Sequence, residues 1–501
     1  NGTCSASTNV PVTINALPTP NFTTPITEVC AGETGVVYTV DAGYTNYTWT
    51  ITEGTVTAGG TTSDNTVTID WTGSGTGNVA VMVTDANGCM ASVDVDVTIA
   101  TGLNVTLSIS SPTCDVDGGI IQVEGLTPAD WVHDMIASGS DSFYSIQDGA
   151  SYSYDIPKKI QEKIPGQDSF IILDNVRKTT EVYSNSGVSV QDLGDGILNV
   201  EFQSKMNTIG GDVLAGLNKA IDMAEKDFAG LVVGNQGPNF SVGANIGMIF
   251  MMAAEQEYDE LNAAIKYFQD TMMRMRYSSI PTISAPHGMA LGGGCEISLH
   301  ADKIVAAAET YMGLVEFGVG VIPGGGGSKE MALRASDTFR KGDVQLNTLQ
   351  EYFLTIGMAK VSTSAYEAFD LGLLQKGKDV VVVNKDRQIA TAKAHAKLMA
   401  DAGYTQPVHR KDVLVLGKQA LGMFLVGTDA MKDSHYISEH DMKIANKLAY
   451  VMAGGDLSEP TLVSEQYLLD LEREAFLSLC TERKTLERIQ HMLTKGKPLR
   501  N

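Results

Sequence analysis

PTISAPHGMALGGGCEISLHADKIVAAAETYMGLVEFGVGVIPGGGGSKE, residues 281–330, is the stretch that decides the fold of the C-terminal part of this 501-residue chain. It contains two glycine-rich turns, residues 292–294 and 324–327, and two glutamates, Glu296 and Glu316. A strand-like run enters the first turn and a helix-like run leaves it. A glycine turn that opens a helix gathers free backbone N–H groups at the positive end of the helix dipole. We therefore expect a site for an oxyanion or a phosphate, with two carboxylates available as acid and base.

Strand-like and helix-like patterns alternate on both sides of this stretch. We expect a hairpin at residues 193–202, where Asp195-Gly196 is a strong turn signal. The other expected elements are helices at residues 210–226, 248–277 and 296–301 and strands at 230–233, 281–285 and 303–308. This alternation predicts an α/β fold with a buried sheet. Beyond about residue 405 the pattern is helical, with an apolar stripe at Leu468, Leu471, Ala475, Leu479, Leu486, Ile489 and Leu493 that predicts packing on the domain or on a neighbouring subunit.

The first 127 residues have a different character. They contain twelve acidic residues and no lysine or arginine, and the first lysine or arginine of the chain is Lys158. The net charge of −23 argues against a nucleic-acid partner. No apolar run reaches the roughly 18–20 residues that a membrane span needs. Period-two alternation at residues 35–40, 47–51, 66–71, 78–84 and 92–99 predicts an all-β sandwich.

Four cysteines indicate a repeat in this part. Cys4 and Cys89 lie 85 residues apart, Cys30 and Cys114 lie 84 apart, and each pair has similar neighbours. Cys30 and Cys89 flank Trp49 within the one whole repeat. Two interpretations are open, a disulfide across the sandwich or two buried free thiols. We favour the disulfide, because an even cysteine pattern in a lysine-free β array suggests secretion. The region resembles the PKD-like or immunoglobulin-like repeats of bacterial cell-surface proteins.

The repeat pattern breaks off near Gly125, and residues 131–136 predict a helix. This abrupt change suggests a seam between two polypeptides, from a natural fusion or a misassembled reading frame. We interpret the chain as six segments: the end of a truncated repeat (1–24), an Ig/PKD-like sandwich (25–105), the start of a truncated repeat and the seam (106–127), a linker (128–184), the α/β domain (185–385) and a helical extension (386–501).

Four motifs in a fixed order carry a resemblance to a known family. They are FSVGANI at 240–246, ALGGGCE at 290–296, GLVE at 313–316 and IPGGGG at 322–327. Each motif is weak alone, and their order and spacing are specific. The segment of about 185–385 resembles the crotonase, or enoyl-CoA hydratase/isomerase, superfamily. The resemblance implies a spiral of ββα turns, C-terminal helices that build trimers, and an acyl-CoA substrate.

The resemblance also implies a role for individual residues. An enolate-like oxygen needs two preorganised N–H donors, which are implied at Ala244 and Gly293. Glu296 would activate water and Glu316 would handle the C2 proton. The implied substrate contacts are Ser241, Gly243, Ala244, Asn245, Ile246, Gly292, Gly293, Pro323 and Gly324. Taken singly, Glu296 could merely complement a helix dipole and Glu316 could be a solvated surface residue, but the joint pattern favours catalysis, and the presence of both glutamates favours a hydratase.

Two departures from the family concern the CoA moiety. Asn245 stands where the family commonly has Asp, and Gly247-Met248 lacks a basic residue that some members carry near the CoA phosphates. No G-x-G-x-x-G follows a strand, so we expect no NAD site and no cofactor besides the acyl-CoA substrate. We interpret His287 and His300, which flank the first glycine turn, as structural because the chemistry needs no imidazole. His435 and His440 lack a metal-binding helix spacing such as H-E-x-x-H, so we expect no metal site.

Residues 128–501 as a whole resemble the C-terminal half of a bacterial two-part β-oxidation protein, in which a 3-hydroxyacyl-CoA dehydrogenase precedes the hydratase. We predict an enoyl-CoA hydratase that adds water in syn fashion to a 2-enoyl-CoA in fatty-acid β-oxidation. Three alternatives stay open: an enoyl-CoA isomerase, part of a dehydrogenase-named bifunctional enzyme without its NAD domain, and an adhesin-like binding protein with an inert crotonase part. We expect a trimer-based homo-oligomer and a cytoplasmic location for the crotonase part, whereas the β repeats suggest the cell surface or secretion.

Overall fold

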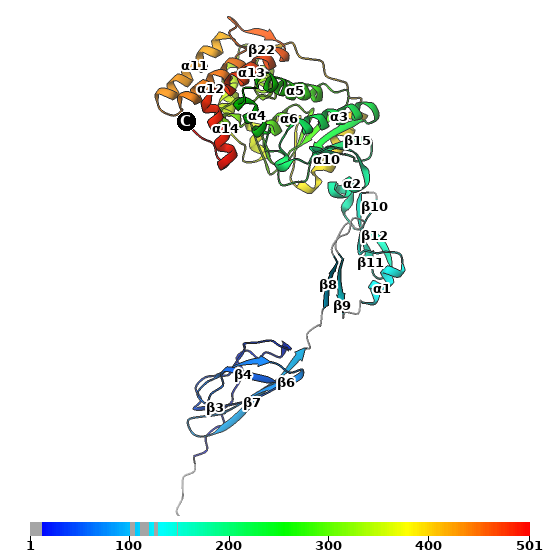
Figure 1. Cartoon of the computed structure of the whole chain (residues 1–501), viewed down its shortest axis with the longest axis vertical. Coiled ribbons are helices and arrows are strands. Elements are labelled where there is room, and N and C mark those ends of the chain that lie inside the picture. Colours follow the sequence, from blue (N-terminus) through cyan, green and yellow to red (C-terminus); the bar gives the residue numbers. More distant parts are fainter. Residues whose placement is uncertain (1–12, 101–105, 111–119, 125–128, 148) are drawn as a thin grey trace, which may run out of the picture. The chain divides into compact units, whose positions relative to one another are not determined.

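The computed structural model describes residues 13–100, 106–110, 120–124, 129–147 and 149–501. The chain divides into two compact units, Asn1–Asp130 and Trp131–Asn501 (Figure 1). The predicted repeat fragments around Cys4 and Cys114 lie outside the described residues. The six segment boundaries inferred from the sequence stay predictions.

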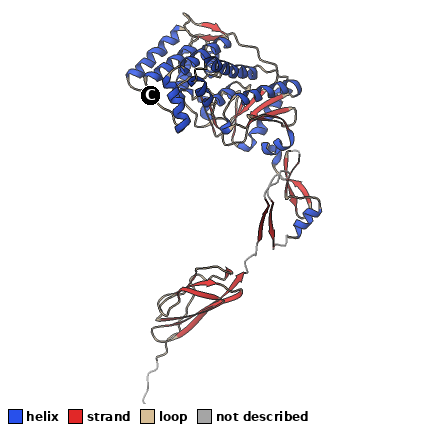
Figure 2. Cartoon of the chain, viewed as in Figure 1, coloured by secondary structure: helices blue, strands red, loops and turns tan. Residues whose placement is uncertain are grey.

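The first unit contains a β-sandwich (Figure 2). One sheet has the strand order β1-β7-β6-β3 and the other has β2-β5-β4. The strands are β1 (Glu28–Cys30), β2 (Val36–Thr39), β3 (Asn46–Thr52), β4 (Gly54–Gly59), β5 (Thr66–Trp71), β6 (Gly75–Thr84) and β7 (Met90–Ala100), followed by a hairpin of β8 (Thr106–Ser110) and β9 (Ile120–Glu124). The all-β region expected from the alternating pattern is confirmed.

The core of the sandwich follows the period-two pattern. On β7, Val97 and Ile99 are buried while Thr98 between them is exposed, because successive strand side chains point to opposite faces. Trp71 is fully buried in this core. Trp49 is only partly buried and donates its indole N–H to the carbonyl of Asp64, so Trp71 rather than Trp49 is the central tryptophan.

The predicted disulfide between Cys30 and Cys89 is wrong, because both are free thiols. Cys30 ends β1 and pairs with Ala100 at the far end of β7, whereas Cys89 directly precedes the first residue of that strand. The 11 residues of β7 span roughly 33 Å at about 3.3 Å per residue. A disulfide requires Cα atoms less than about 7 Å apart. Of the alternative, two buried free thiols, only the free state holds, because Cys30 is exposed and Cys89 is only partly buried.

The second unit begins with a small module. It contains α1 (Asp130–Ala137), which confirms the helix expected at residues 131–136, then a three-stranded antiparallel sheet and α2 (Leu173–Thr180). The strands of this sheet are β10 (Tyr144–Gln147), β11 (Ala150–Asp155) and β12 (Ile160–Lys163). Helix α2 packs on β11, β13 and β14, so it joins the small module to the main domain.

A seven-stranded sheet forms the centre of the main domain. Its order is β13-β14-β15-β16-β17-β19-β21, antiparallel from β13 to β15 and parallel from β15 onward. The strands are β13 (Glu181–Ser184), β14 (Val188–Asp192), β15 (Ile197–Phe202), β16 (Gly230–Gly234), β17 (Thr282–Ala285), β19 (Lys303–Ala307) and β21 (Val380–Val382). The hairpin expected around Asp195-Gly196 is formed by β14 and β15. All six residues of β15 are buried, as expected for a strand covered on both faces.

Two successive ββα units place the glycine turns. The first unit runs from β17 through β18 (Gly288–Leu291) to α6 (Gly293–Leu299). The second runs from β19 through β20 (Thr310–Gly313) and the short 3-10 helix η3 (Glu316–Val319) to α7 (Gly327–Thr338). Strands β18 and β20 pair in parallel, apart from the main sheet. This is the ββα arrangement that the crotonase resemblance implied.

Helices cover the sheet and build the C-terminal extension. They are α3 (Gly211–Asp227), α4 (Ile246–Ala254), α5 (Tyr258–Arg276), α8 (Gln345–Gly357), α9 (Ala365–Asp370), α10 (Gln388–Asp401), α11 (Lys418–Asp433), α12 (Glu439–Met452), α13 (Glu465–Cys480) and α14 (Arg483–Lys495). Two short strands, β22 (Val413–Val415) and β23 (Thr461–Val463), pair antiparallel although α11 and α12 separate them in the chain. The single helix expected at residues 248–277 is two helices, because Gln256 adopts φ 63° between α4 and α5. No helix among the described residues is long and apolar enough to cross a membrane.

Candidate active site

Glu296 lies in the first turn of α6 and joins the two glycine turns. Its side chain is buried, and its Oε1 accepts hydrogen bonds from the backbone N–H groups of Gly325 and Gly327, each 2.8 Å away. These donors open α7 and have no acceptor within that helix. Burial, with the nearby charges of Glu316 and Glu472, raises the pKa of Glu296 well above its ordinary value.

Glu316 begins η3 on the other side of the first glycine turn. Its Oε2 is buried and has no hydrogen-bond partner among the described residues. Its Oε1 lies against Gly292, where an added Cβ would stand 3.0 Å from it. Gly292 has φ 52°, so both its backbone and this carboxylate require glycine there. Burial, and to a smaller degree the charge of Glu472, raises the pKa of Glu316 to about 8.

The backbone N–H groups of Ala244 and Gly293 lie close together. A Cβ added to Gly293 would stand 3.3 Å from the nitrogen of Ala244. Gly293 is the first residue of α6, so its N–H has no acceptor within the helix. The parallel bridge between Ile209 and Ala244 uses the carbonyl of Gly243 and the N–H of Asn245. The N–H of Ala244 therefore points away from that bridge, and the two expected oxyanion donors come together.

Other predicted substrate contacts have structural roles. Ser241 is fully buried, donates its Oγ–H to the carbonyl of Asn207 at 2.7 Å and accepts the N–H of Gly243 at 3.2 Å. Asn245 caps α4, because its side chain accepts the N–H of Met248. Ile246, half-buried, is the first residue of α4.

Pro323 and Gly324 belong to the second glycine turn and face the C-terminal extension. A Cβ added to Gly324 would stand 2.7 Å from the ring of Phe476 on α13, and the carbonyl of Pro323 accepts the hydroxyl of Ser328. Of the nine predicted contacts, Gly243, Ala244, Gly292 and Gly293 gather at one point. The others support the loops around it.

Two residues near the site were missed by the sequence reasoning. The ring of Phe268 on α5 lies between the two glycine turns, since a Cβ added to Gly293 or Gly325 would stand 3.0 or 2.4 Å from it. Glu472 on α13 is fully buried and accepts the N–H of Gly326 at 2.7 Å. Burial raises its pKa to about 7. Helical periodicity could reveal that both side chains are buried, but not that they meet this site.

The histidines beside the turns have structural partners. His300 ends α6, bonds the carbonyl of Glu296 through Nδ1 at 2.7 Å and lies 2.9 Å from Nζ of Lys329 through Nε2. Burial and the cations Lys329 and Arg276 lower its pKa well below the ordinary value. His287 lies 2.8 Å from the carbonyl of Gly237, and burial lowers its pKa to about 4. No cluster of His, Cys, Asp and Glu in the described part could hold a metal ion.

A buried ion network stands behind the site. The fully buried Lys329 places Nζ 3.1 Å from Glu465 and 3.3 Å from Glu330. Arg334 lies 3.0 Å from Glu330, and Arg276 pairs with the same carboxylate. The network ties α5, α7 and α13 together, so the extension is part of the framework of the site.

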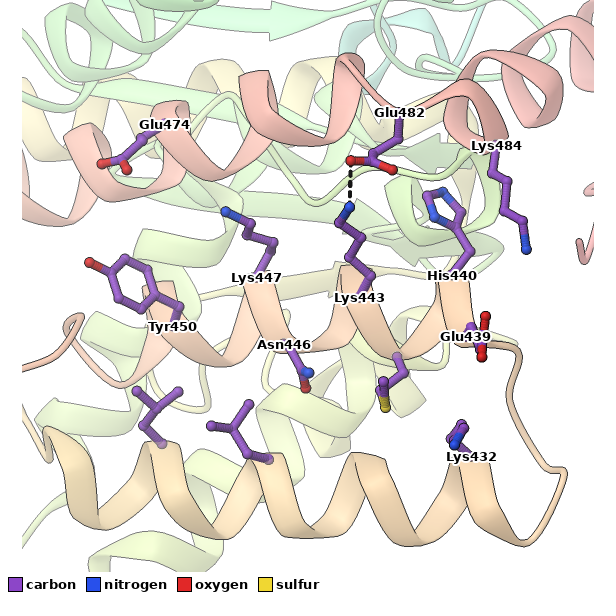
Figure 3. A pocket seen from close by; sticks show the side chains of 13 residues that line it. Lys432, Glu439, His440, Lys443, Asn446, Lys447, Tyr450, Glu474, Glu482 and Lys484 are labelled. Atoms are coloured by element: carbon purple, nitrogen blue, oxygen red, sulfur yellow. Dashed lines mark hydrogen bonds and ion pairs between the residues drawn. The ribbon is translucent and has the colours of Figure 1, made fainter.

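Two cavities lie among the described residues of the second unit. One, of about 530 Å³, is lined by the loops that follow β15 and β16, including Asn207 and Asn239, and by Arg177 of α2. Asn207 donates to the carbonyl of Asn239, and its own carbonyl accepts from Ser241, so this cavity adjoins the oxyanion turn. The other cavity, of about 700 Å³, lies among α11, α12, α13 and α14 (Figure 3).

Comparison with known proteins agrees with this geometry. The model of the enoyl-CoA hydratase/isomerase family matches residues 192–338, and the model of the PKD-like domain matches residues 16–99. The C-terminal region is therefore a crotonase domain of the enoyl-CoA hydratase/isomerase family. A PKD-like domain precedes it in the same chain.

Curated relatives of this chain are named as a 3-hydroxyacyl-CoA dehydrogenase or as a fatty acid oxidation complex trifunctional enzyme. A probable 3-hydroxyacyl-CoA dehydrogenase of Bacillus subtilis is 46% identical over 372 residues, covering 74% of this chain and 46% of that protein. A protein of Rickettsia felis, named as a fatty acid oxidation complex trifunctional enzyme, is 31% identical over 57% of this chain and 36% of its own length. The chain thus spans less than half the length of these relatives. A solved enoyl-CoA hydratase from Bacillus halodurans aligns over 61% of this chain and 99% of its own, at 17% identity and a TM-score of 0.41.

Proposed function

We propose that the crotonase domain is an enoyl-CoA hydratase that adds water to a 2-enoyl-CoA thioester. The observation that carries this proposal is the contrast between its two acidic side chains. Glu296 accepts two backbone N–H bonds, whereas the buried Oε2 of Glu316 has no partner among the described residues. Hydrogen bonds to a carboxylate favour its charged form, and burial without donors favours the neutral acid. Burial raises the pKa of both carboxyls, and the two N–H donors oppose that rise at Glu296, so we assign the role of base to Glu296 and the role of acid to Glu316.

The reaction follows from these two states. Glu296 takes a proton from water while the water oxygen bonds to C3 of the substrate. The electrons of the double bond move toward the thioester oxygen, which the N–H groups of Ala244 and Gly293 hold. Glu316 delivers its proton to C2. Addition is syn when both carboxylates face the same side of the double bond.

The cavity beside Asn207 and Asn239 is our candidate for part of the CoA moiety. It lies at the carboxyl ends of the parallel strands β15 and β16, where α/β sheets commonly bind ligands. Arg177 is a cation on its wall, bonded to Glu201 at 2.9 Å. It stands in for the basic residue that is missing at Gly247-Met248. No NAD site is proposed in this chain.

Hydration of crotonyl-CoA tests the function directly. The reaction consumes the conjugated thioester, so its ultraviolet absorbance falls. An unchanged spectrum with folded protein would overturn the proposal and favour an inert, binding role. A rise in absorbance with a 3-enoyl-CoA, without hydration of the product, would assign the isomerase instead. Place in β-oxidation, trimer-based assembly and cellular location remain predictions for the whole protein.

A further inference from the structure

Helix α13 brings a third carboxylate to the site from outside the matched residues 192–338. Glu472 is fully buried, with Oε1 2.7 Å from the nitrogen of Gly326 and Oε2 3.1 Å from the nitrogen of Lys329. Glu296 takes the N–H groups of Gly325 and Gly327. Glu296 of α6 and Glu472 of α13 thus accept neighbouring N–H groups of the same turn, residues 325–327.

We infer that Glu472 is a positioning residue of the proposed hydratase, which holds the turn that binds Glu296 and adds a negative charge that sets the protonation of Glu296 and Glu316. This inference rests on the proposed function. Glu472 accepts the N–H groups of Gly326 and Lys329, so we assign it a role on the turn and not on the reacting atoms. It acts only through these groups.

The burial of Glu472 speaks against simple helix capping. An uncharged Asn or Ser can cap a helix, whereas a buried carboxylate carries a desolvation cost. Its charge is among the causes that raise the pKa of Glu296 and of Glu316. Burial raises its own pKa to about 7, so its charge changes near neutral pH.

The groups that face Glu472 come from five elements. Gln269 of α5 donates to its Oε1 at 3.2 Å, and Lys329 of α7 is the cation that lowers its pKa. Its charge raises the pKa of Glu296 of α6 and of Glu316 of η3. On α13 itself, Arg473 is bonded to Gln269 and Glu465 to Lys329. The near cations are already paired with other groups, so the charge of Glu472 is not cancelled.

Glu472→Gln tests the inference, because it keeps the side-chain volume and one acceptor oxygen and removes the charge. The pH profile of kcat/KM for crotonyl-CoA is measured for the full chain. We expect the acidic and the basic limb of this pH profile to move to lower pH by on the order of one unit, because loss of the charge lowers the pKa of Glu296 and of Glu316. We expect kcat to fall about tenfold and KM to change less than twofold, since Glu472 does not contact substrate.

Glu474→Gln is the matched control on the same helix. Glu474 is exposed and points into the separate cavity of about 700 Å³, near Lys447 and Tyr450 (Figure 3). Its profile and kcat are expected to equal those of the unaltered protein. Glu472→Asp keeps the charge but shortens the reach, so its limbs stay in place while kcat falls.

Each outcome decides. If the unaltered protein hydrates crotonyl-CoA and folded Glu472→Gln keeps its limbs, the inference is overturned and the proposed function stands. If Glu472→Gln does not fold, Glu472→Asp decides: unchanged kcat overturns the inference, and reduced kcat with unmoved limbs supports it. An inactive unaltered protein removes the proposed function and the inference with it.

Discussion

Replacing Glu316 with glutamine separates its catalytic role from its effect on stability. With a pKa of about 8, the Glu316 carboxyl is about nine-tenths protonated at pH 7, by the ordinary titration relation. An amide cannot deliver that proton to C2. General acid–base groups contribute about 10²- to 10⁴-fold, so Glu316→Gln is expected to lower kcat by at least about 10²-fold. That loss corresponds to about 2.7 kcal/mol of transition-state stabilisation.

The unaltered protein has a matching pH dependence. kcat/KM for crotonyl-CoA is expected to fall as pH rises through about 8, where Glu316 loses its proton. The assay is the loss of ultraviolet absorbance of crotonyl-CoA between pH 5 and 10. A Glu316→Gln rate within tenfold of the unaltered protein would refute the acid role. So would a profile that stays flat through pH 8 to 9.

The same substitution, Glu316→Gln, should lower kcat but raise the stability of the folded protein at pH 8. The folded-state pKa of Glu316 is raised above the unfolded value of about 4.3, so the folded state binds this proton more tightly. The stabilisation is complete below pH 4.3 and is lost as pH rises toward 8, on the order of a few kcal/mol. Glu316→Gln removes this loss, so the variant should unfold at higher denaturant concentration than the unaltered protein at pH 8. Equal midpoints at pH 8 would contradict the buried position of this carboxyl.

Three further predictions concern other residues. Gly292→Ala places a Cβ 3.0 Å from Glu316 Oε1 at a residue with φ 52°. We expect about 1–2 kcal/mol of strain and at least tenfold lower kcat. Denaturant unfolding and steady-state kinetics measure the two effects, and an unchanged kcat would count against the site geometry. Lys329→Met removes the buried cation 3.1 Å from Glu465 and leaves that carboxylate with Arg276 at 3.8 Å. We expect a loss of about 3–5 kcal/mol in the free energy of unfolding, measured by denaturant unfolding, and a loss below about 1 kcal/mol would contradict the buried pair. Cys30 and Cys89 should be alkylated in the folded, unreduced protein, whereas the buried Cys295 and Cys480 should react only after unfolding. Peptide mass spectrometry measures the alkylation of each cysteine, and a lack of alkylation at Cys30 and Cys89 would contradict the free thiols.

Local patterns predicted the parts of the site that short segments build. The turn at residues 292–294 and the helix that carries Glu296 follow from glycine, strand and helix signals within one ββα unit, although α6 (Gly293–Leu299) begins three residues before the helix expected at 296–301. Helix α3 and strands β16, β17 and β19 follow the expected ranges to within about two residues. Such elements depend on near neighbours, so periodicity is sufficient to find them.

The errors share a different origin. The disulfide failed because β1 pairs with the far end of β7, a contact across some 70 residues of chain. The prediction of one long helix at residues 248–277 was wrong because Gln256 adopts a left-handed backbone conformation. Glu472 was overlooked although it lies on the apolar stripe between Leu468 and Ala475, where a carboxylate requires a buried partner. The position of Glu472 on this stripe was the one signal in the sequence that it is buried.

The sequence by itself determined the two kinds of domain and the two glutamates with their glycine turns, because alternation, composition and motif order are local properties. Only the tertiary structure decided which thiols stay apart, which carboxylate receives hydrogen bonds and which does not. It also brought Phe268 and Glu472 to the turn at residues 325–327. These facts depend on burial and on contacts between distant segments, because burial and contacts set the free energy of protonation of each carboxyl group.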